Sequence, residues 1–133
     1  MSPYREVDHT ADWALEVWAP TLEVLFVDAA HGMYALAGTA PGPNRLTRRV
    51  EVSGDDYESL LVAWLQELLY ATESEGLVFS DFHIDTLTPT HLRVEASGGP
   101  GERLEKVIKA VTYHNLRIQQ TANGYTATLV FDV

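Results

Sequence analysis

The 133 residues carry 19 acidic against 9 basic side chains, for a formal net charge of −10, and 46% of them are hydrophobic. This length supports one hydrophobic core of ordinary size and is too short for two, so we expect a single domain over residues 1–133. The negative charge opposes a phosphate backbone, which disfavours broad binding of RNA or DNA and favours a cation or a basic partner. Because there is no cysteine, disulfides, thiolate zinc sites and thiol nucleophiles are excluded.

The N-terminus and the hydrophobic runs show no targeting or membrane signal. The first six residues, Met1 to Glu6, are polar and do not resemble a signal peptide. No apolar run approaches the roughly 18 residues that a membrane-spanning helix needs. We therefore expect a cytoplasmic protein that does not enter a membrane.

The first half of the chain alternates between strand and helix patterns. Short alternating or aromatic segments indicate strands, and apolar residues at helical spacing after a capping residue indicate helices. Asp55 or Asp56 can cap the second helix, with Glu58 at capping-box spacing from Asp55. The expected elements are strands at 4–7 and 15–18, a helix that begins at Thr21, runs to about Leu36 and stops at Gly38, a strand at 46–52, and a second helix that ends near Thr72.

The second half predicts four strands. Segments 77–87 and 92–96 should form a hairpin, and the glycine-rich stretch 98–101 should break the chain after it. β-branched and aromatic residues predict a long strand over 107–119, and Asn123-Gly124 is a hairpin signal before a last strand at 125–133. The order is ββαβαββββ. Two helices and a run of antiparallel hairpins favour an α+β fold, with the helices packed against an antiparallel or mixed sheet.

Carboxylates are concentrated at the two ends of the sequence. The pentapeptide Asp8-His9-Thr10-Ala11-Asp12 carries two carboxylates and an imidazole. The last two residues, Asp132 and Val133, bring an acidic side chain and a terminal carboxylate to one point. Hard cations such as Ca²⁺, Mg²⁺ and Mn²⁺ take oxygen ligands. We therefore expect the two ends to meet and to hold a divalent cation.

Each of these acidic groups also has a plain structural interpretation. Two aspartates four positions apart are often a turn and a cap, because Asp accepts hydrogen bonds from nearby backbone N–H groups. Asp132 could belong to a frayed terminus, although the apolar residues up to Phe131 favour a last strand held in a sheet. The spacing has none of the regularity of an EF-hand loop. The residues alone leave both interpretations open.

The basic candidates are His9, His114 and Lys109. Either histidine could be a ligand, a general base or a structural residue, and His114 shares strand parity with Ile108 and Leu116, which favours a core histidine. Lys109 is by default an exposed strand residue, with a contact to a phosphate or an acidic partner as the alternative. No glycine-rich phosphate loop, Gly-x-Ser-x-Gly elbow or His-x₃-His pair occurs. An autonomous enzyme is therefore not expected.

Six motifs, taken together and in this order, resemble those of the archease family. They are Asp-His-Thr-Ala-Asp at 8–12, Thr-Leu-Glu at 21–23, Leu-x-x-Trp-Leu-x-Glu-Leu-Leu-Tyr at 61–70, Glu-Gly-Leu-Val-Phe at 75–79, Lys-Ala-Val-Thr-Tyr-His at 109–114 and the terminal Phe-Asp-Val. The first and the fifth are the most specific. The resemblance covers essentially the whole chain.

This resemblance implies an accessory protein, not an enzyme, whose partner is an RtcB-type RNA ligase in tRNA splicing and RNA repair. Members of the family promote guanylylation of the ligase and restore its multiple turnover. The family's metal site, described with calcium, corresponds here to Asp12, Asp132 and Val133, and Mg²⁺ or Mn²⁺ are alternative ions. Asp8 corresponds to a polar position beside these ligands. The further candidates for a functional role are His9, Lys109 and His114.

Two other classes of protein stay open. A chaperone-like binding module for RNA-processing proteins would protect unrelated clients from aggregation regardless of metal. A stand-alone metal-dependent phosphatase or nuclease would release phosphate or cleaved RNA by itself, and it would need more acidic ligands than the sequence places.

Overall fold

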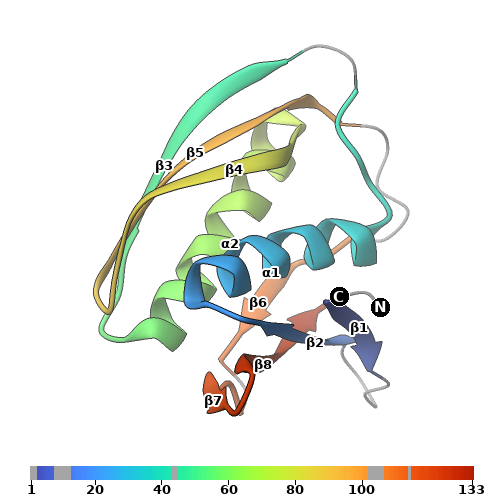
Figure 1. Ribbon diagram of the computed structural model, residues 1–133. Coiled ribbons are helices and arrows are strands. Elements are labelled where there is room, and N and C mark those ends of the chain that lie inside the picture. Colours follow the sequence, from blue (N-terminus) through green and yellow to red (C-terminus); the bar gives the residue numbers. More distant parts are fainter. Residues whose placement is uncertain (1–2, 8–12, 43–44, 102–106, 114) are drawn as a thin grey trace.

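Two helices lie between two β-sheets (Figure 1). The computed structural model describes residues 3–7, 13–42, 45–101, 107–113 and 115–133. The elements in chain order are β1 (Tyr4–Val7), β2 (Trp13–Ala19), α1 (Leu22–Ala37), β3 (Leu46–Ser53), α2 (Tyr57–Glu75), β4 (Leu77–Thr88), β5 (His91–Pro100), β6 (Ala110–Thr112), β7 (Gln119–Thr121) and β8 (Gly124–Asp132). Neither helix in these described ranges is long and apolar enough to cross a membrane.

The strands divide into a sheet of five and a sheet of three. The larger sheet has the order β1-β2-β8-β6, and β7 also pairs with β8. The smaller sheet has the order β3-β5-β4. Every pairing between the described strands is antiparallel. The predicted α+β class is confirmed, while the division into two sheets is not indicated by the sequence pattern.

Both helices begin and end at the residue types that favour those positions. The Thr21 hydroxyl accepts a hydrogen bond from the Val24 N–H at 3.2 Å, and Asp56, the cap of α2, accepts one from the Ser59 N–H at 2.7 Å. Gly38 and Gly76 end the helices in the left-handed conformation, at φ of 70° and 69°, which costs a glycine little. The predicted end of α2 near Thr72 was too early, because the first left-handed residue comes four positions later.

The core is formed where the helices meet the inner faces of the sheets. Trp64 of α2 is 1% exposed, and its indole N–H donates to the Phe26 carbonyl of α1 at 3.0 Å. Its ring also meets Phe82 of β4 edge-on, with the ring centroids 5.5 Å apart. The largest fully buried side chains come from both helices and both sheets: Trp64, Phe26, Phe79, Phe131, Leu15, Leu25, Met33, Leu60, Leu61, Leu65, Leu68 and Leu92.

Two glycine signals in the sequence were misread. The stretch predicted to break the chain at 98–101 mostly continues β5, which runs to Pro100. A Cβ on Gly98 would lie 2.1 Å from the Val78 carbonyl oxygen, so this glycine permits close packing of β5 against β4. The predicted hairpin after β7 is present, but its turn residues are 122 and 123. Gly124 belongs to β8, where a Cβ would meet the Ala19 carbonyl oxygen at 2.1 Å.

The predicted long strand over 107–119 was wrong, because only its parts pair with a neighbouring strand. Within the described residues of this range, strand structure covers only Ala110–Thr112, which form β6, and Gln119, the first residue of β7. Two N–H groups of this segment, one of them within β6, bond to side chains of α2. The Val111 N–H donates to Gln66 Oε1 at 3.1 Å, and the Ile118 N–H donates to Glu58 Oε2 at 3.0 Å.

His31 of α1 forms a hydrogen bond to β4 at a position where the strand pairing is irregular. The pairing of β4 with β5 shifts register between Phe79 and Asp81, and the His31 Nε2–H donates to the Ser80 carbonyl oxygen there at 2.9 Å. His31 Nδ1 lies 4.0 Å from a carboxylate oxygen of Asp28, whose side chain is 19% exposed. Burial raises the pKa of Asp28 above its ordinary value of 3.8, and His31 opposes this rise.

We predict that Asp28→Asn raises the melting temperature at pH 7 by roughly 1 to 3 °C. The pKa of Asp28 is higher in the folded protein than in the unfolded chain. The contribution of Asp28 to the free energy of unfolding is therefore lost as the pH rises through and above 3.8. The gain should vanish near pH 3, where the carboxyl is protonated in both states. Thermal unfolding followed by circular dichroism at the two pH values checks this, with the exposed Asp55→Asn as the control for net charge. A less stable variant at pH 7 would mean that attraction to His31 outweighs the cost of burial.

Candidate functional site

The last residues of β8 are held by strands on both sides. Trp13, the first residue of β2, pairs with Phe131, and Ala110, the first residue of β6, pairs with Asp132. The Lys109 N–H also donates to the Asp132 carbonyl oxygen at 2.7 Å. Adjacent strands in a sheet lie about 4.8 Å apart. The main chain at Asp132 is therefore fixed in the sheet, against the interpretation of a frayed terminus.

The side chains at the end of β8 alternate between the core and solvent. Phe131 is fully buried, Asp132 is exposed, and Val133 is partly buried against the core. The side chain of Asp132 thus lies on the face of the sheet that is directed away from the helices. A carboxylate in this position can reach a cation or a partner without disturbing the core.

The strands on either side of the acidic pentapeptide end in the same part of the sheet. Val7, the last residue of β1, pairs with Ala14, which in turn pairs with Val130 of β8. Trp13 pairs with Phe131, one position further along. The described residues that flank segment 8–12 are thus in register with the last residues of β8. The predicted site residues Asp8, His9 and Asp12 themselves lie outside the described residues, as does His114.

The described residues contain only part of the predicted ligand set. Asp132 and Val133 are described, and no group of three or more His, Asp or Glu side chains that could hold a metal occurs within the described ranges. Lys109 is exposed and precedes β6, so the prediction of exposure is confirmed but that of a strand position is wrong. It is adjacent in sequence to Ala110, the strand partner of Asp132.

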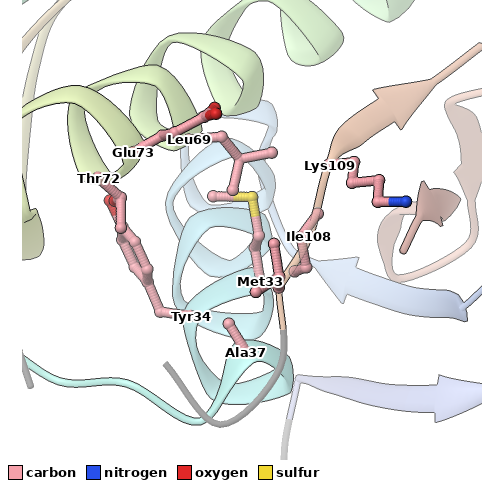
Figure 2. Close-up of a pocket in the computed structure, with 9 residues that line it drawn as sticks. Met33, Tyr34, Ala37, Leu69, Thr72, Glu73, Ile108 and Lys109 are labelled. Atoms are coloured by element: carbon pink, nitrogen blue, oxygen red, sulfur yellow. The ribbon is translucent and has the colours of Figure 1, made fainter. Parts of the chain in front are cut away.

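A second feature, which the sequence did not indicate, is an open cavity of about 380 Å³ between the helices and the segment before β6 (Figure 2). Figure 2 shows Met33, Leu69 and Ile108 grouped at its centre, with the Lys109 side chain directed away from them. The lining residues are Met33, Tyr34, Ala37, Leu69, Thr72, Glu73, Val107, Ile108 and Lys109. Because they come from three segments that are distant in sequence, no local pattern could have predicted this cavity.

Tyr34, one of the lining residues, has a buried hydroxyl. Burial raises the pKa of Tyr34 to about 12, so the hydroxyl stays protonated, and the Phe79 backbone and the Thr72 side chain partly oppose the rise. Neither group meets hydrogen-bond geometry with the hydroxyl. The lining is otherwise mainly apolar, with Glu73 and Lys109 as its charged residues, so the cavity can accept an apolar group.

Comparison with known proteins gives one consistent result. The model of the Archease protein family (MTH1598/TM1083) matches residues 4–133. The protein archease of Methanopyrus kandleri is 34% identical over 140 residues, which cover 98% of this chain and 99% of that protein. The protein archease of Methanosarcina barkeri is also 34% identical, over 139 residues that cover 98% of this chain and 95% of the relative.

Two solved structures have the same fold. The solution structure of Methanobacterium thermoautotrophicum protein 1598 covers 100% of both chains, with a TM-score of 0.74 and 27% identity. The crystal structure of a Thermotoga maritima protein, described as an archease and possible chaperone, covers 97% of this chain and 96% of its own, with a TM-score of 0.71 and 20% identity. With the family match along nearly its whole length, the chain belongs to the archease family.

Proposed function

We propose that this protein is an accessory factor that activates a GTP-dependent RtcB-type RNA ligase in tRNA splicing and RNA repair, by promoting guanylylation and multiple turnover of the ligase. The observation that carries this proposal is the archease family match over residues 4–133. An accessory role also agrees with the description of the Thermotoga maritima relative as a possible chaperone. The expected partner is the ligase, and not naked nucleic acid, because the net charge is −10.

The proposed cofactor is a divalent metal, most readily Ca²⁺, with Mg²⁺ or Mn²⁺ as alternatives. Asp12, Asp132 and the main-chain oxygens of Val133 would hold it. This donor set consists of oxygen atoms, which hard cations prefer, and contains neither sulfur nor imidazole. The exposure of Asp132 and its fixed main chain support the assignment. Asp8, His9, Lys109 and His114 are proposed to act around this site.

The bound ion would supply positive charge that neutralises and orients phosphate oxygens. The proposed ligands would place that charge on an exposed part of the sheet, because Asp132 is exposed there, and the ligase could reach it. Because β2 and β6 already fix the end of β8 by main-chain pairing, we favour a metal that acts at the contact with the ligase over one that only pins the chain end. The acidic surface would then dock on a basic surface of the ligase.

A chaperone-like binding module is the second candidate. The open apolar cavity and the exposed side chains of Tyr70, Val107 and Tyr113, which are at least 60% exposed, favour it. Such a module predicts that the protein suppresses aggregation of unrelated clients and that chelation of metals does not change this effect.

We predict that Asp132→Asn weakens Ca²⁺ binding at least about tenfold, because it removes a charged ligand and keeps the shape of the side chain. Since Asp132 is exposed, the melting temperature without metal should change little. Isothermal titration calorimetry gives the affinity, and Asp55→Asn, which removes another exposed carboxylate, before α2, is the matched control. Equal Ca²⁺ affinity of the two variants would remove Asp132 from the site.

The proposed function is tested by multiple-turnover RNA ligation with the cognate ligase and GTP. We predict that substoichiometric amounts of the intact protein allow many turnovers per ligase, whereas Asp132→Asn loses most of this stimulation and Asp55→Asn retains it. A pull-down with the ligase shows whether the metal is needed for docking or for the chemical step. If Asp132→Asn still binds the ligase but does not stimulate it, the metal acts at the chemical step. If the intact protein changes neither turnover nor guanylylation, the activator proposal fails and the chaperone assay decides.

A further inference from the structure

The described residues between Val107 and Ile118 run along α2 in the opposite direction. Lys109 and Glu73 line the same cavity, Val111 bonds to Gln66, and Ile118 bonds to Glu58. The three helix positions 58, 66 and 73 are separated by about two turns each, so they form one stripe on α2. These α2 positions contact the described part of 107–118, which does not pair continuously with a neighbouring strand.

The bond from Gln66 lies closest to the end of β8. β6 consists of only three residues, Ala110 to Thr112, and on one side it pairs with β8. Val111 is 6% exposed, and its N–H donates to the Gln66 side-chain carbonyl at 3.1 Å. A buried N–H that loses its acceptor costs more than an ordinary hydrogen bond contributes. Gln66 therefore provides a polar attachment of this short strand to the helix.

The two residues that precede Val111 contact Asp132 of β8. Ala110 is the strand partner of Asp132, and the Lys109 N–H donates to the Asp132 carbonyl oxygen at 2.7 Å. A displacement of β6 at Val111 would release both contacts. Gln66 is thus linked to Asp132 through the Val111 and Lys109 N–H groups, by hydrogen bonds that are present without a metal.

We propose that Gln66 is a positioning residue for the metal site at the end of β8: through β6 it fixes the main chain of Asp132 and so the direction of its carboxylate. This inference rests on the proposed function, because the site that it positions is the metal site proposed there. An amide suits this task, because it accepts the Val111 N–H and adds no charge beside a site that already gathers carboxylates. Glu58 makes the corresponding bond at the far end of the segment, beside β7.

The test compares Gln66→Met, which keeps side-chain length and removes the acceptor, with Glu58→Met, which removes the analogous bond far from Asp132. Amide hydrogen exchange, measured by NMR on the metal-free protein, should accelerate about fivefold or more at Lys109 and Val111 in Gln66→Met. In Glu58→Met the acceleration should be confined to Ile118 and its neighbours. The Gln66→Glu variant keeps an oxygen acceptor and should restore slow exchange at Lys109.

Calcium affinity supplies the second measurement. We expect Gln66→Met to weaken Ca²⁺ binding about threefold to tenfold, with Glu58→Met close to the intact protein. Unchanged exchange at Lys109 in Gln66→Met would overturn the inference, and so would unchanged Ca²⁺ affinity while Lys109 exchange is fast. A general loss of stability would appear in both methionine variants and would also count against it. If the intact protein binds neither Ca²⁺ nor Mn²⁺, the metal proposal fails, and the Lys109 exchange alone decides whether Gln66 positions Asp132.

Discussion

The pairing of β8 with β2 is the constraint on which the rest of the structure depends. Seven residue pairs, from Trp13 with Phe131 to Ala19 with Tyr125, join segments more than a hundred residues apart. Leu15, Val17, Leu129 and Phe131 face the helices in this register, and a slip of one residue would turn them to solvent and turn Asp132 into the core. The register that builds the core is thus the same register that leaves Asp132 exposed beside the start of β2.

The helix α2 contributes both to the core and to the segment that leads to β6 and β7. Its apolar face, centred on Trp64, fills the space between the sheets, while Glu58 and Gln66 supply hydrogen-bond acceptors to the segment that leads to β6 and β7. The five-stranded sheet therefore does not end in an unpaired row of N–H groups at these two positions. This arrangement couples the packing of α2 to the part of the sheet where the end of the chain lies, and it is the physical basis for a role of Gln66 away from the proposed ligands.

The positions of the helices and their caps could be predicted from the sequence, because short-range interactions determine them. The periodicity of α1 and α2, the Thr21 cap and the Gly38 end follow from short-range rules and agree with the structure. The break in 107–119 lies at a turn, where the Leu116 N–H donates to the Tyr113 carbonyl oxygen at 3.0 Å and Asn115 has a positive φ of 51°, and the β-branched and aromatic residues around it gave no signal for this turn. Gly98 was misread as a chain breaker because the close approach of Val78 is a tertiary contact. The prediction that the ends meet agrees with Trp13 beside Phe131, while Asp12 as a ligand stays a prediction, since the acidic pentapeptide lies outside the described residues.

The most direct measurement is paramagnetic broadening of amide signals by Mn²⁺ in the ¹⁵N-labelled protein, because it locates a bound cation without reference to any activity. If the two ends of the chain hold one ion, substoichiometric Mn²⁺ should first remove the signals of Trp13, Ala110, Phe131 and Asp132, which the sheet places together. Signals of the turn between β4 and β5, in the other sheet, should persist. Broadening that begins elsewhere, for example at the acidic end of α2 around Glu73 and Glu75, or that affects all signals equally, would contradict a metal site built from the two chain ends.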